Sequence, residues 1–181
     1  MRPWAMVCGF VLLLAGAVTT ATGETAPDFS LPDLDGKAVR LSSVYAKGPV
    51  VAAFWATWCV PCPEELKHLQ RFYEKYPADS LTVLAIAIDG PKTVSKVKPF
   101  VLGRRITMPV LLDSNNDVKR LYRVGAVPTV CVIERGGRIA YSHVGYRPGD
   151  EVNLEKEIRK AIAADSTRTP ATPANAPSGK S

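Results

Sequence analysis

Side chains that bind metals are scarce in this sequence. Its 181 residues include two histidines and four cysteines, and only Cys59 and Cys62 share the C-x-x-C spacing. A structural zinc site needs four ligands, usually supplied as two such pairs. Cys131, His68 and His143 are isolated and follow no second-pair spacing. We therefore expect no metal site.

The sequence also disfavours a haem-binding or purely structural role for the cysteine pair. A c-type haem needs a histidine directly after the second cysteine, and Pro63 stands there. A purely structural disulfide explains little, because closing so short a loop removes little chain entropy. Electron exchange fits better, so we expect a redox-active Cys59–Cys62 disulfide and no further cofactor.

The sequence has no nucleic-acid-binding motif and no internal repeat. The formal net charge is +6, and the densest basic run comprises Lys92, Lys96, Lys98, Arg104 and Arg105. Without an accompanying motif, such a run indicates a solvated face. We expect one domain and no nucleic-acid partner.

The longest apolar run lies at the N-terminus. Ala5–Val18 is apolar over 14 residues, Arg2 is the only charge before Glu24, and the small residues "TTATG" follow the run. This pattern predicts that residues 1–23 are a secretory signal peptide. The alternative is an uncleaved membrane anchor, because uncharged sequence from Trp4 to Gly23 approaches the ~20 residues of a membrane span. Either reading places the domain outside the cytoplasm, in the periplasm or an equivalent compartment.

The C-terminal stretch is rich in proline, alanine and threonine. "ADSTRTPATPANAPSGKS", residues 164–181, has no apolar period. Such a composition buries too little surface to offset the cost of ordering the chain, so a disordered tail is predicted. The folded domain is expected to span residues 24–163.

Apolar patterns within this domain predict alternating strands and helices. Apolar runs favour strands at 49–55, 81–89 and 108–113, with an antiparallel hairpin formed by 128–134 and 138–144. Three- and four-residue spacing favours helices at 61–76, 93–103, 115–124 and 150–162. An alternating stretch at 37–45 suggests an edge strand or hairpin. This order predicts an α/β fold with helices on both faces of a sheet whose first half is parallel and whose end is antiparallel.

Three finer expectations concern the helices. Pro99 favours a bend or break in the helix at 93–103. Asn115 or Asn116 is a candidate cap for the helix that follows. The last helix is expected to bury Val152, Leu154, Ile158 and Ile162.

The cysteine pair lies where a buried strand meets an amphipathic helix. Unpaired backbone N–H groups and the helix dipole favour an anion at such a junction, so Cys59 is expected to be an exposed, nucleophilic thiolate. Cys62 lies further into the helix and can attack a mixed disulfide made by Cys59. Pro61 suits the helix start because it has no N–H to leave unpaired.

Glu65 and Pro128 are the other candidate site residues. Helical spacing from Cys62 places Glu65 on the core-facing side, beneath the cysteine pair, where a carboxyl group can take up and release protons as the thiols change state. The simpler alternative is a glutamate favoured by the helix dipole. Pro128 in "GAVPTVCVI" precedes an apolar strand, which is compatible with an edge or strand-start position.

Several stretches together resemble one known family. "PDFSLPDLDGKAVRLSS", "FWATWCVPCPEEL", "MPVLLDSNNDVKRLYRV", "GAVPT" and "VIERGGRIAYSHVG" occur in the order typical of TlpA/ResA-like thioredoxin-fold proteins. The resemblance runs from about Ala26 to Ala163. It implies a thioredoxin-like fold with a central mixed sheet, an N-terminal hairpin and a helical insert from Gly90 to Met108. These are exported thiol–disulfide oxidoreductases, typically reductants that include cytochrome c maturation proteins.

The resemblance also implies roles for individual residues. Cys59 would be the attacking thiol, Cys62 the resolving thiol and Glu65 the acid of the active-site helix. A cis Val127–Pro128 bond would face the cysteines, with Val127 pairing with the substrate backbone. Trp58 joins Val127 and Pro128 as expected substrate-binding residues.

The implied partners are an exported protein that carries a disulfide and a membrane thiol-electron donor. We expect a monomer that engages them in turn. Two alternatives stay open: a thiol oxidase or isomerase of the same fold, and a non-catalytic redox-sensing or binding module. Cys131 is expected to be a buried inert thiol, and His68 and His143 receive no role.

Two departures from the family pattern stand out, at Ala53 and Lys67, and a peroxidase is a rival interpretation. Ala53 occupies the place, six residues before the first cysteine, where family members often carry asparagine and thioredoxins aspartate, which leaves proton handling to Glu65. Lys67 replaces a frequent helix proline. A peroxidase would need proline and threonine where Ala52 and Ala56 stand, which disfavours that activity.

Overall fold

The structure is a computed structural model that describes residues 23–78 and 80–167. The predicted signal or anchor segment up to residue 22, and the tail from residue 168, lie outside the described residues. Within the described ranges, no helix is both long and apolar enough to cross a membrane.

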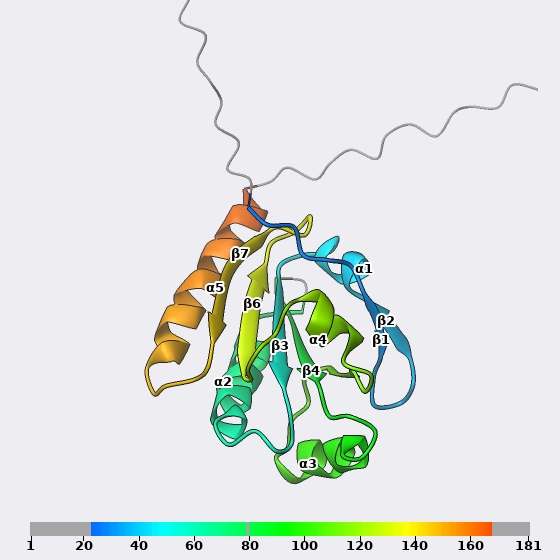
Figure 1. The fold of residues 1–181 in the computed structure, drawn as a ribbon. Helices are drawn as coiled ribbons and strands as arrows, with labels where there is room; N and C mark the ends of the chain where they lie inside the picture. The colour runs from blue at the N-terminus through cyan, green and yellow to red at the C-terminus, as the bar shows by residue number, and fades with distance from the viewer. Residues whose placement is uncertain (1–22, 79, 168–181) are drawn as a thin grey trace, which may run out of the picture.

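A five-stranded mixed sheet forms the centre of the domain (Figure 1). Its strands are β3 (Val50–Trp55), β4 (Thr82–Ala87), β5 (Val110–Leu112), β6 (Thr129–Ile133) and β7 (Ile139–Val144), arranged in the order β5-β4-β3-β6-β7. Pairing is parallel among β3, β4 and β5 and antiparallel from β3 through β6 to β7. The predicted change from parallel to antiparallel pairing is therefore confirmed. The three central strands are almost wholly buried, as expected for apolar runs covered on both faces.

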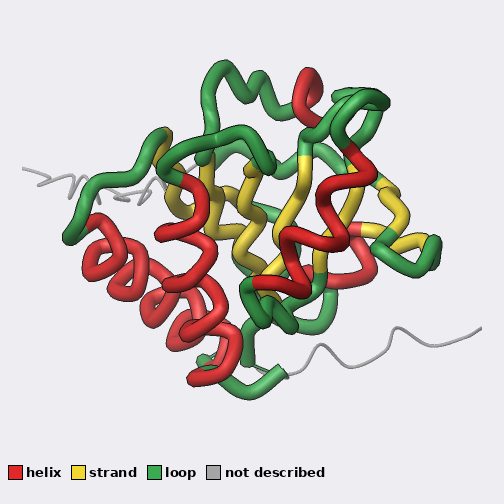
Figure 2. Tube along the Cα trace, turned by 90° about the horizontal axis from the view of Figure 1, so that it is seen from below, coloured by secondary structure: helices red, strands yellow, loops and turns green. Residues whose placement is uncertain are grey.

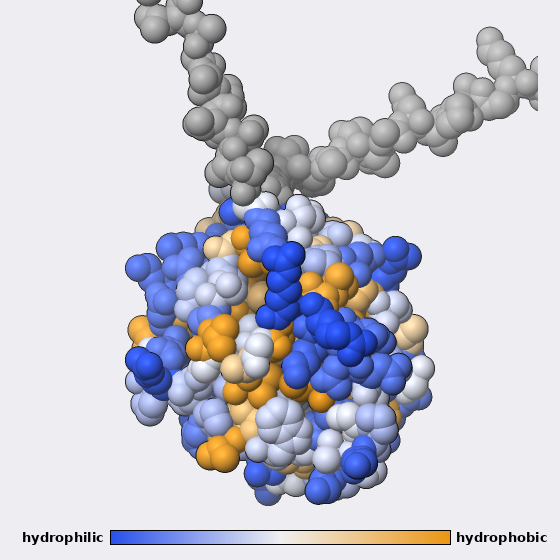
Figure 3. Space-filling view, in the orientation of Figure 1, coloured by the Kyte–Doolittle hydropathy of each residue, from blue (hydrophilic) through white to orange (hydrophobic). Residues whose placement is uncertain are grey.

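Helices lie on both sides of the sheet (Figure 2). The helices α2 (Cys62–Lys75) and α5 (Asp150–Ser166) contact each other and cover one face. The short helix α4 (Asp117–Leu121) lies on the other face, where the ring of Tyr122 packs 5.3 Å from that of Phe54. Figure 3 shows mostly hydrophilic side chains on the face drawn in Figure 1, with apolar ones gathered near its centre.

The N-terminal hairpin is shorter than its sequence pattern suggested. The strands β1 (Ser30–Pro32) and β2 (Ala38–Arg40) pair antiparallel, and the following residues form helix α1 (Leu41–Tyr45) instead of continuing the strand. Ser42, near the start of α1, donates its backbone N–H to the carboxylate of Asp28 at 2.8 Å. This cap comes from a segment before the hairpin, so the local alternation could not reveal it.

The helical insert follows β4. It consists of a 3₁₀ turn, η1 (Val94–Lys96), and helix α3 (Val97–Gly103), which confirms the predicted insert. The expected bend or break near Pro99 corresponds to a division of this segment two residues earlier, where η1 ends at Lys96 and α3 begins at Val97. Pro99 itself lies in the first turn of α3, where its missing N–H would have no helical partner. The ring of Phe100 packs 5.0 Å from that of Trp55 and joins the insert to the central strand.

The cap of α4 also differs from the prediction. Asn116 precedes the helix with a left-handed backbone (φ 58°), and its side chain makes no capping hydrogen bond. The buried carboxylate of Asp113 instead accepts hydrogen bonds from the backbone N–H groups of Val118 (3.2 Å) and Lys119 (2.7 Å). A carboxylate satisfies two helix N–H groups at once and also opposes the helix dipole.

The last helix is longer than predicted, and the face that it buries differs in part from the predicted one. α5 continues to Ser166, three residues into the stretch assigned to the tail, and its Asp165 pairs with Arg135. It buries Leu154, Ile158 and Ala161, with Ile162 partly buried. Val152, predicted to be buried, is 69% exposed. Val152 lies two residues before Leu154. Two residues correspond to more than half a helical turn, so Val152 points away from the buried face.

Candidate active site

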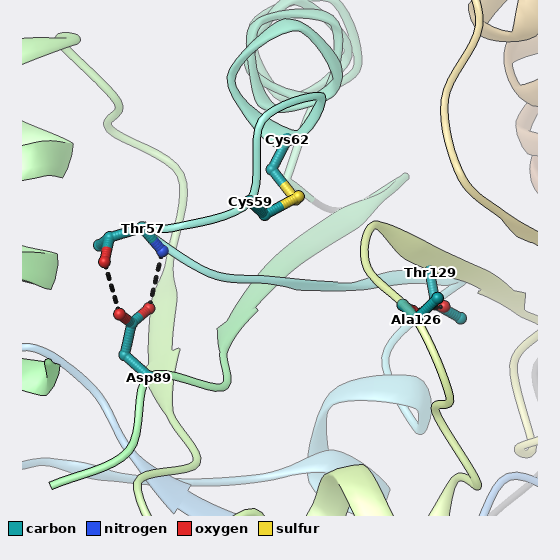
Figure 4. Close-up of a disulfide and its surroundings, with 6 residues drawn as sticks. All are labelled: Thr57, Cys59, Cys62, Asp89, Ala126 and Thr129. Atoms are coloured by element: carbon teal, nitrogen blue, oxygen red, sulfur yellow. Dashed lines mark hydrogen bonds between the residues drawn. A yellow bond between two sulfur atoms is a disulfide. The ribbon is translucent and has the colours of Figure 1, made fainter. Parts of the chain in front are cut away.

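The cysteine pair lies at the junction between β3 and α2 (Figure 4). Cys59 and Cys62 form a disulfide with sulfurs 2.00 Å apart, and Cys62 is the first residue of α2. Pro61 occupies the N-cap position and Pro63 the first turn, where prolines interrupt no helical hydrogen bond. Cys59 is only 6% exposed, so the expectation of an exposed residue is wrong for this disulfide form, and Cys62 is fully buried.

A buried aspartate anchors the loop that precedes Cys59. The carboxylate of Asp89 accepts hydrogen bonds from the backbone N–H (2.9 Å) and the hydroxyl (2.5 Å) of Thr57 (Figure 4). Asp89 is fully buried two residues after the end of β4. It thus ties the cysteine loop to the neighbouring strand. Spacing along the chain did not predict this contact, although an aspartate just beyond a buried parallel strand was a signal for it.

The loop before β6 lies next to the same junction. Strand β6 runs antiparallel to β3, so Thr129 at its start pairs with Phe54 near the end of β3. The Val127–Pro128 bond is cis, as the family resemblance implied. The Thr129 hydroxyl donates to the carbonyl of Ala126 at 2.6 Å and closes the turn. Figure 4 shows Ala126 and Thr129 across from the disulfide.

A groove of about 380 Å³ separates these two loops. Trp58 and Cys59 border it on one side and Val127 on the other, so three of the expected site residues meet there. Pro128 directly follows Val127. Trp58 is 58% exposed and Val60 92% exposed. The complete lining is Trp58, Cys59, Val60, Pro61, Ile88, Lys119, Gly125, Ala126 and Val127. Lys119 is the one charged residue in this lining, and the groove is otherwise largely apolar.

Glu65 lies one helical turn after Cys62 and is only 3% exposed, as its spacing predicted. Its Oε1 is 2.7 Å from Nε2 of His143 on β7. The His143 side chain is 14% exposed and that of Glu65 4%. Glu65 Oε2 and His143 Nδ1 are buried and have no hydrogen-bond partner among the described residues. Ala53 is buried in β3.

Spacing along the chain assigned His143 no role, although its place in β7 carried a signal. Along β7, exposure alternates, so that Ile139, Tyr141 and His143 face inward. A histidine in the inward register of an edge strand, opposite a helix that carries a buried glutamate, was a candidate partner for it. The contact spans 78 residues of sequence, which spacing arguments do not reach.

His68 belongs to a separate cluster. Its Nε2 is 3.1 Å from the hydroxyl of Tyr146, which also donates to the carboxylate of Glu151 at 3.1 Å. Burial and the hydrogen bond to Glu151 raise the pKa of Tyr146. This cluster joins α2 to the start of α5.

Cys131 stands apart from the redox pair. It is buried in the middle of β6 and forms no disulfide. Burial, with a smaller contribution from Glu24, raises the pKa of its thiol to about 11. Within the described ranges, no cluster of three or more histidine, cysteine, aspartate or glutamate residues could hold a metal ion.

Comparison with known proteins agrees with this geometry. The model of the AhpC/TSA family matches residues 22–142. A thiol–disulfide oxidoreductase ResA of Geobacillus thermodenitrificans is 36% identical over 140 residues, which cover 77% of this chain and 79% of that protein. A second ResA, from Oceanobacillus iheyensis, is 38% identical over 121 residues, covering 65% of this chain and 62% of that protein.

A solved structure extends the comparison. A candidate thiol:disulfide interchange protein DsbE from Chlorobium tepidum superposes with a TM-score of 0.72 at 34% identity, over 77% of this chain and 96% of that one. The TlpA/ResA-like resemblance and the thioredoxin-like fold are therefore confirmed. The chain belongs to the AhpC/TSA family and is a thiol–disulfide oxidoreductase of the ResA/DsbE type.

Proposed function

We propose that this protein is an exported reductant of protein disulfides that acts through a Cys59/Cys62 dithiol. The observation that carries the proposal is the asymmetry of the pair, since Cys59 borders the groove while Cys62 is fully buried. Only the sulfur at the groove can be approached by a protein substrate. Cys59 therefore attacks, and Cys62 reaches it from within the helix.

The reaction passes two electrons to the substrate. The Cys59 thiolate attacks one substrate sulfur and forms a mixed disulfide, and the other substrate sulfur leaves as a thiolate that takes up a proton. Cys62 then loses its proton and attacks Cys59, which releases the second substrate sulfur. The substrate ends as a dithiol and the protein as the Cys59–Cys62 disulfide. Glu65, one turn from Cys62, takes the proton that Cys62 gives up.

The groove provides the substrate site. Trp58 and Val127 flank Cys59 and offer apolar contact to a peptide on either side of its disulfide, while the backbone of Val127 pairs with that of the substrate. The Lys119 ammonium favours substrates that carry a carboxylate beside the disulfide. Apocytochrome c with an oxidised haem-binding cysteine pair is a fitting substrate class, given the family resemblance.

Export and electron supply complete the proposal. The N-terminal apolar run supports delivery across a membrane, with or without retention as an anchor. An oxidised protein in an oxidising compartment needs a source of electrons, and a membrane thiol donor would supply them.

Trapping of substrate tests the role of each cysteine. A Cys62→Ser variant is expected to accumulate mixed disulfides with its substrates, because nothing resolves the bond made by Cys59. A Cys59→Ser variant should accumulate few or none, and Cys131→Ser should behave as the parent protein. Non-reducing gels followed by mass spectrometry would identify the captured proteins. Equal trapping by both variants would contradict the assignment.

The direction of electron flow is a separate measurement. Equilibration against glutathione gives the reduction potential of the pair. A value near about −270 mV, as in thioredoxin, supports a reductant, whereas one near about −120 mV supports an oxidase. If the intact dithiol reduces no protein disulfide at all, the result favours a non-catalytic redox-sensing or binding module over a reductant.

A further inference from the structure

The full burial of Cys62 poses a problem of proton transfer. Its sulfur must lose a proton whenever it attacks the mixed disulfide and regain one whenever the disulfide is reduced. Cys62 has no exposed surface, so water cannot take that proton directly. Glu65 is nearly as enclosed, at 3% exposed. A carboxyl in that position can accept a proton from Cys62 but needs a route by which to discharge it.

His143 connects this enclosed acid to the edge of the domain. Its Nε2 is 2.7 Å from Glu65 Oε1, and it comes from β7, the outermost strand on this side of the sheet. Its side chain is 14% exposed against 4% for Glu65, so the imidazole is the half of the pair that water reaches more readily. The ring also borders a surface hollow of about 420 Å³.

Two buried atoms of Glu65 and His143 that lack hydrogen-bond partners bear on this route for the proton. Glu65 Oε2 and His143 Nδ1 are buried polar atoms without a partner among the described residues, and such atoms in a redox site call for an explanation. A carboxylate can receive a proton on one oxygen and share the other with a base. An imidazole can accept a proton at one nitrogen and release one from the other, so the route requires a water molecule to enter the hollow beside His143 and reach the buried Nδ1.

We propose that His143 is a positioning residue for Glu65 and relays the Cys62 proton between Glu65 and solvent. This inference rests on the proposed function, since it concerns the resolving step of the Cys59/Cys62 cycle. In that step a Cys59–Cys62 bond forms, the bond from Cys59 to the substrate breaks, and the electron pair leaves on the substrate sulfur. The Cys62 proton passes to Glu65, a proton passes from Oε1 to Nε2 of His143, and the imidazolium returns one to water. The departing substrate thiolate takes up a proton from solvent, so charge and atoms balance.

Other titratable groups surround the relay. Tyr141, on the same strand, has its ring 5.7 Å from that of His143. The loop after β7 and the start of α5 contribute further groups to the hollow, namely Tyr146, Arg147 and Asp150. From α2, the facing group is Glu65.

His68, the second histidine of the chain, belongs to a different hydrogen-bond network. Its ring contacts the hydroxyl of Tyr146, and that hydroxyl donates to Glu151 at the start of α5. His68 is therefore a matched control for His143.

The resolving step can be isolated with 5,5′-dithiobis(2-nitrobenzoate). In the full-length dithiol protein, Cys8 of the N-terminal apolar run is replaced by serine so that it does not react. This protein should release thionitrobenzoate in two phases, the first from attack by Cys59 and the second from displacement by Cys62. His143→Ala is expected to slow the second phase about 100-fold at neutral pH and leave the first within about twofold. Added imidazole should restore the second phase in proportion to its concentration. His68→Gln should leave both phases unchanged.

Each outcome bears on the inference. An unchanged second phase in His143→Ala, or a slow one that imidazole does not restore, would overturn the relay and leave His143 a structural residue. If wild type shows no second phase, the proposed function itself fails, which is a distinguishable result. Should His143→Ala fail to fold, His143→Gln replaces it in the same assay. The amide of glutamine can hydrogen-bond Glu65 but cannot carry a proton, so His143→Gln should also slow the second phase, and an unchanged second phase in that variant would overturn the inference.

Discussion

The two cysteines of the disulfide, Cys59 and Cys62, lie in different surroundings. Cys59 borders an open groove with the exposed rings of Trp58 nearby, whereas Cys62 begins α2 and is wholly enclosed. The difference arises from the geometry of a helix start, since the loop before the first turn stays at the surface while the first turn packs on the sheet. A single C-x-x-C motif can in this way hold one cysteine beside a groove and one that is enclosed.

Cys131 provides a test at the residue scale. Burial raises the pKa of its thiol to about 11 from an ordinary value of 9.0, so its thiolate fraction at pH 8 falls about 100-fold, a factor of ten for each unit. The oxidised, folded protein in a Cys8→Ser background should therefore resist alkylation by iodoacetamide at pH 8, and unfolding it in urea should release one reactive thiol. Mass spectrometry counts the label. Rapid labelling of Cys131 in the folded state would contradict its burial.

At the scale of elements, α4 depends on a residue outside it. Asp113→Ala removes the acceptor for two backbone N–H groups of α4 and should destabilise the protein by about 1–2 kcal/mol in urea unfolding. Asn116→Gly is the matched control. Asn116 makes no capping bond and has a positive φ that glycine adopts freely, so this change should be neutral or slightly stabilising. A larger loss for Asn116→Gly than for Asp113→Ala would reverse the assignment of the cap.

The packing of α2 against α5 gives a pH-dependent prediction. The Glu155 carboxylate on α5 accepts hydrogen bonds from Lys75 and Tyr76, and these bonds lower its pKa. Burial and the bond to Glu155 raise the pKa of Tyr76 to about 12. A carboxyl whose pKa is lowered on folding adds stability above its unfolded value and loses it as the pH falls through its folded value.

Glu155→Gln measures this contribution. The side chain of Glu155 is 27% exposed, so we expect the substitution to cost at most about 1 kcal/mol at pH 7. The difference from wild type should shrink as the pH falls below the usual carboxyl pKa of 4.5. Urea unfolding at pH 7 and pH 3 provides the comparison. A difference of the same size at both values would show that packing, not ionisation, is responsible.

At the scale of the whole molecule, Arg135 joins three segments at the end opposite the disulfide. It follows β6, whose Ile133 pairs with the first residue of β3, and it donates to the carbonyls of Ala46 and Lys47 and to the carboxylate of Asp165 on α5. Arg135→Lys cannot reproduce this fork of donors. It should lower the thermal midpoint while leaving the rate of disulfide reduction per folded molecule unchanged.

The control for this prediction is Arg159→Lys, which changes an exposed arginine of α5 in the same way. It should leave the thermal midpoint unchanged. A loss of activity in Arg135→Lys at a temperature where it remains folded would mean that the two ends of the domain are coupled. Differential scanning calorimetry and an insulin-reduction assay on the same samples separate the two effects.

The amino-acid sequence determined the features that depend on neighbours along the chain. Apolar runs predicted β3 and β4, helical spacing predicted α2, and the spacing of Glu65 from Cys62 correctly predicted its burial. Errors arose where local patterns were ambiguous. The alternation at Leu41–Tyr45 suited a strand as well as a helix, and Val152 is apolar but lies off the buried stripe of α5.

Tertiary structure decided which distant residues meet at the site. Thr57 bonds Asp89 across 32 residues, and Glu65 meets His143 across 78. Periodicity predicts which face of an element is buried, but the register of one element against another depends on the packing of the whole core. The sequence by itself therefore determined the cysteine pair and the burial of Glu65, while only the folded domain supplied the aspartate that holds the cysteine loop and the histidine that contacts Glu65.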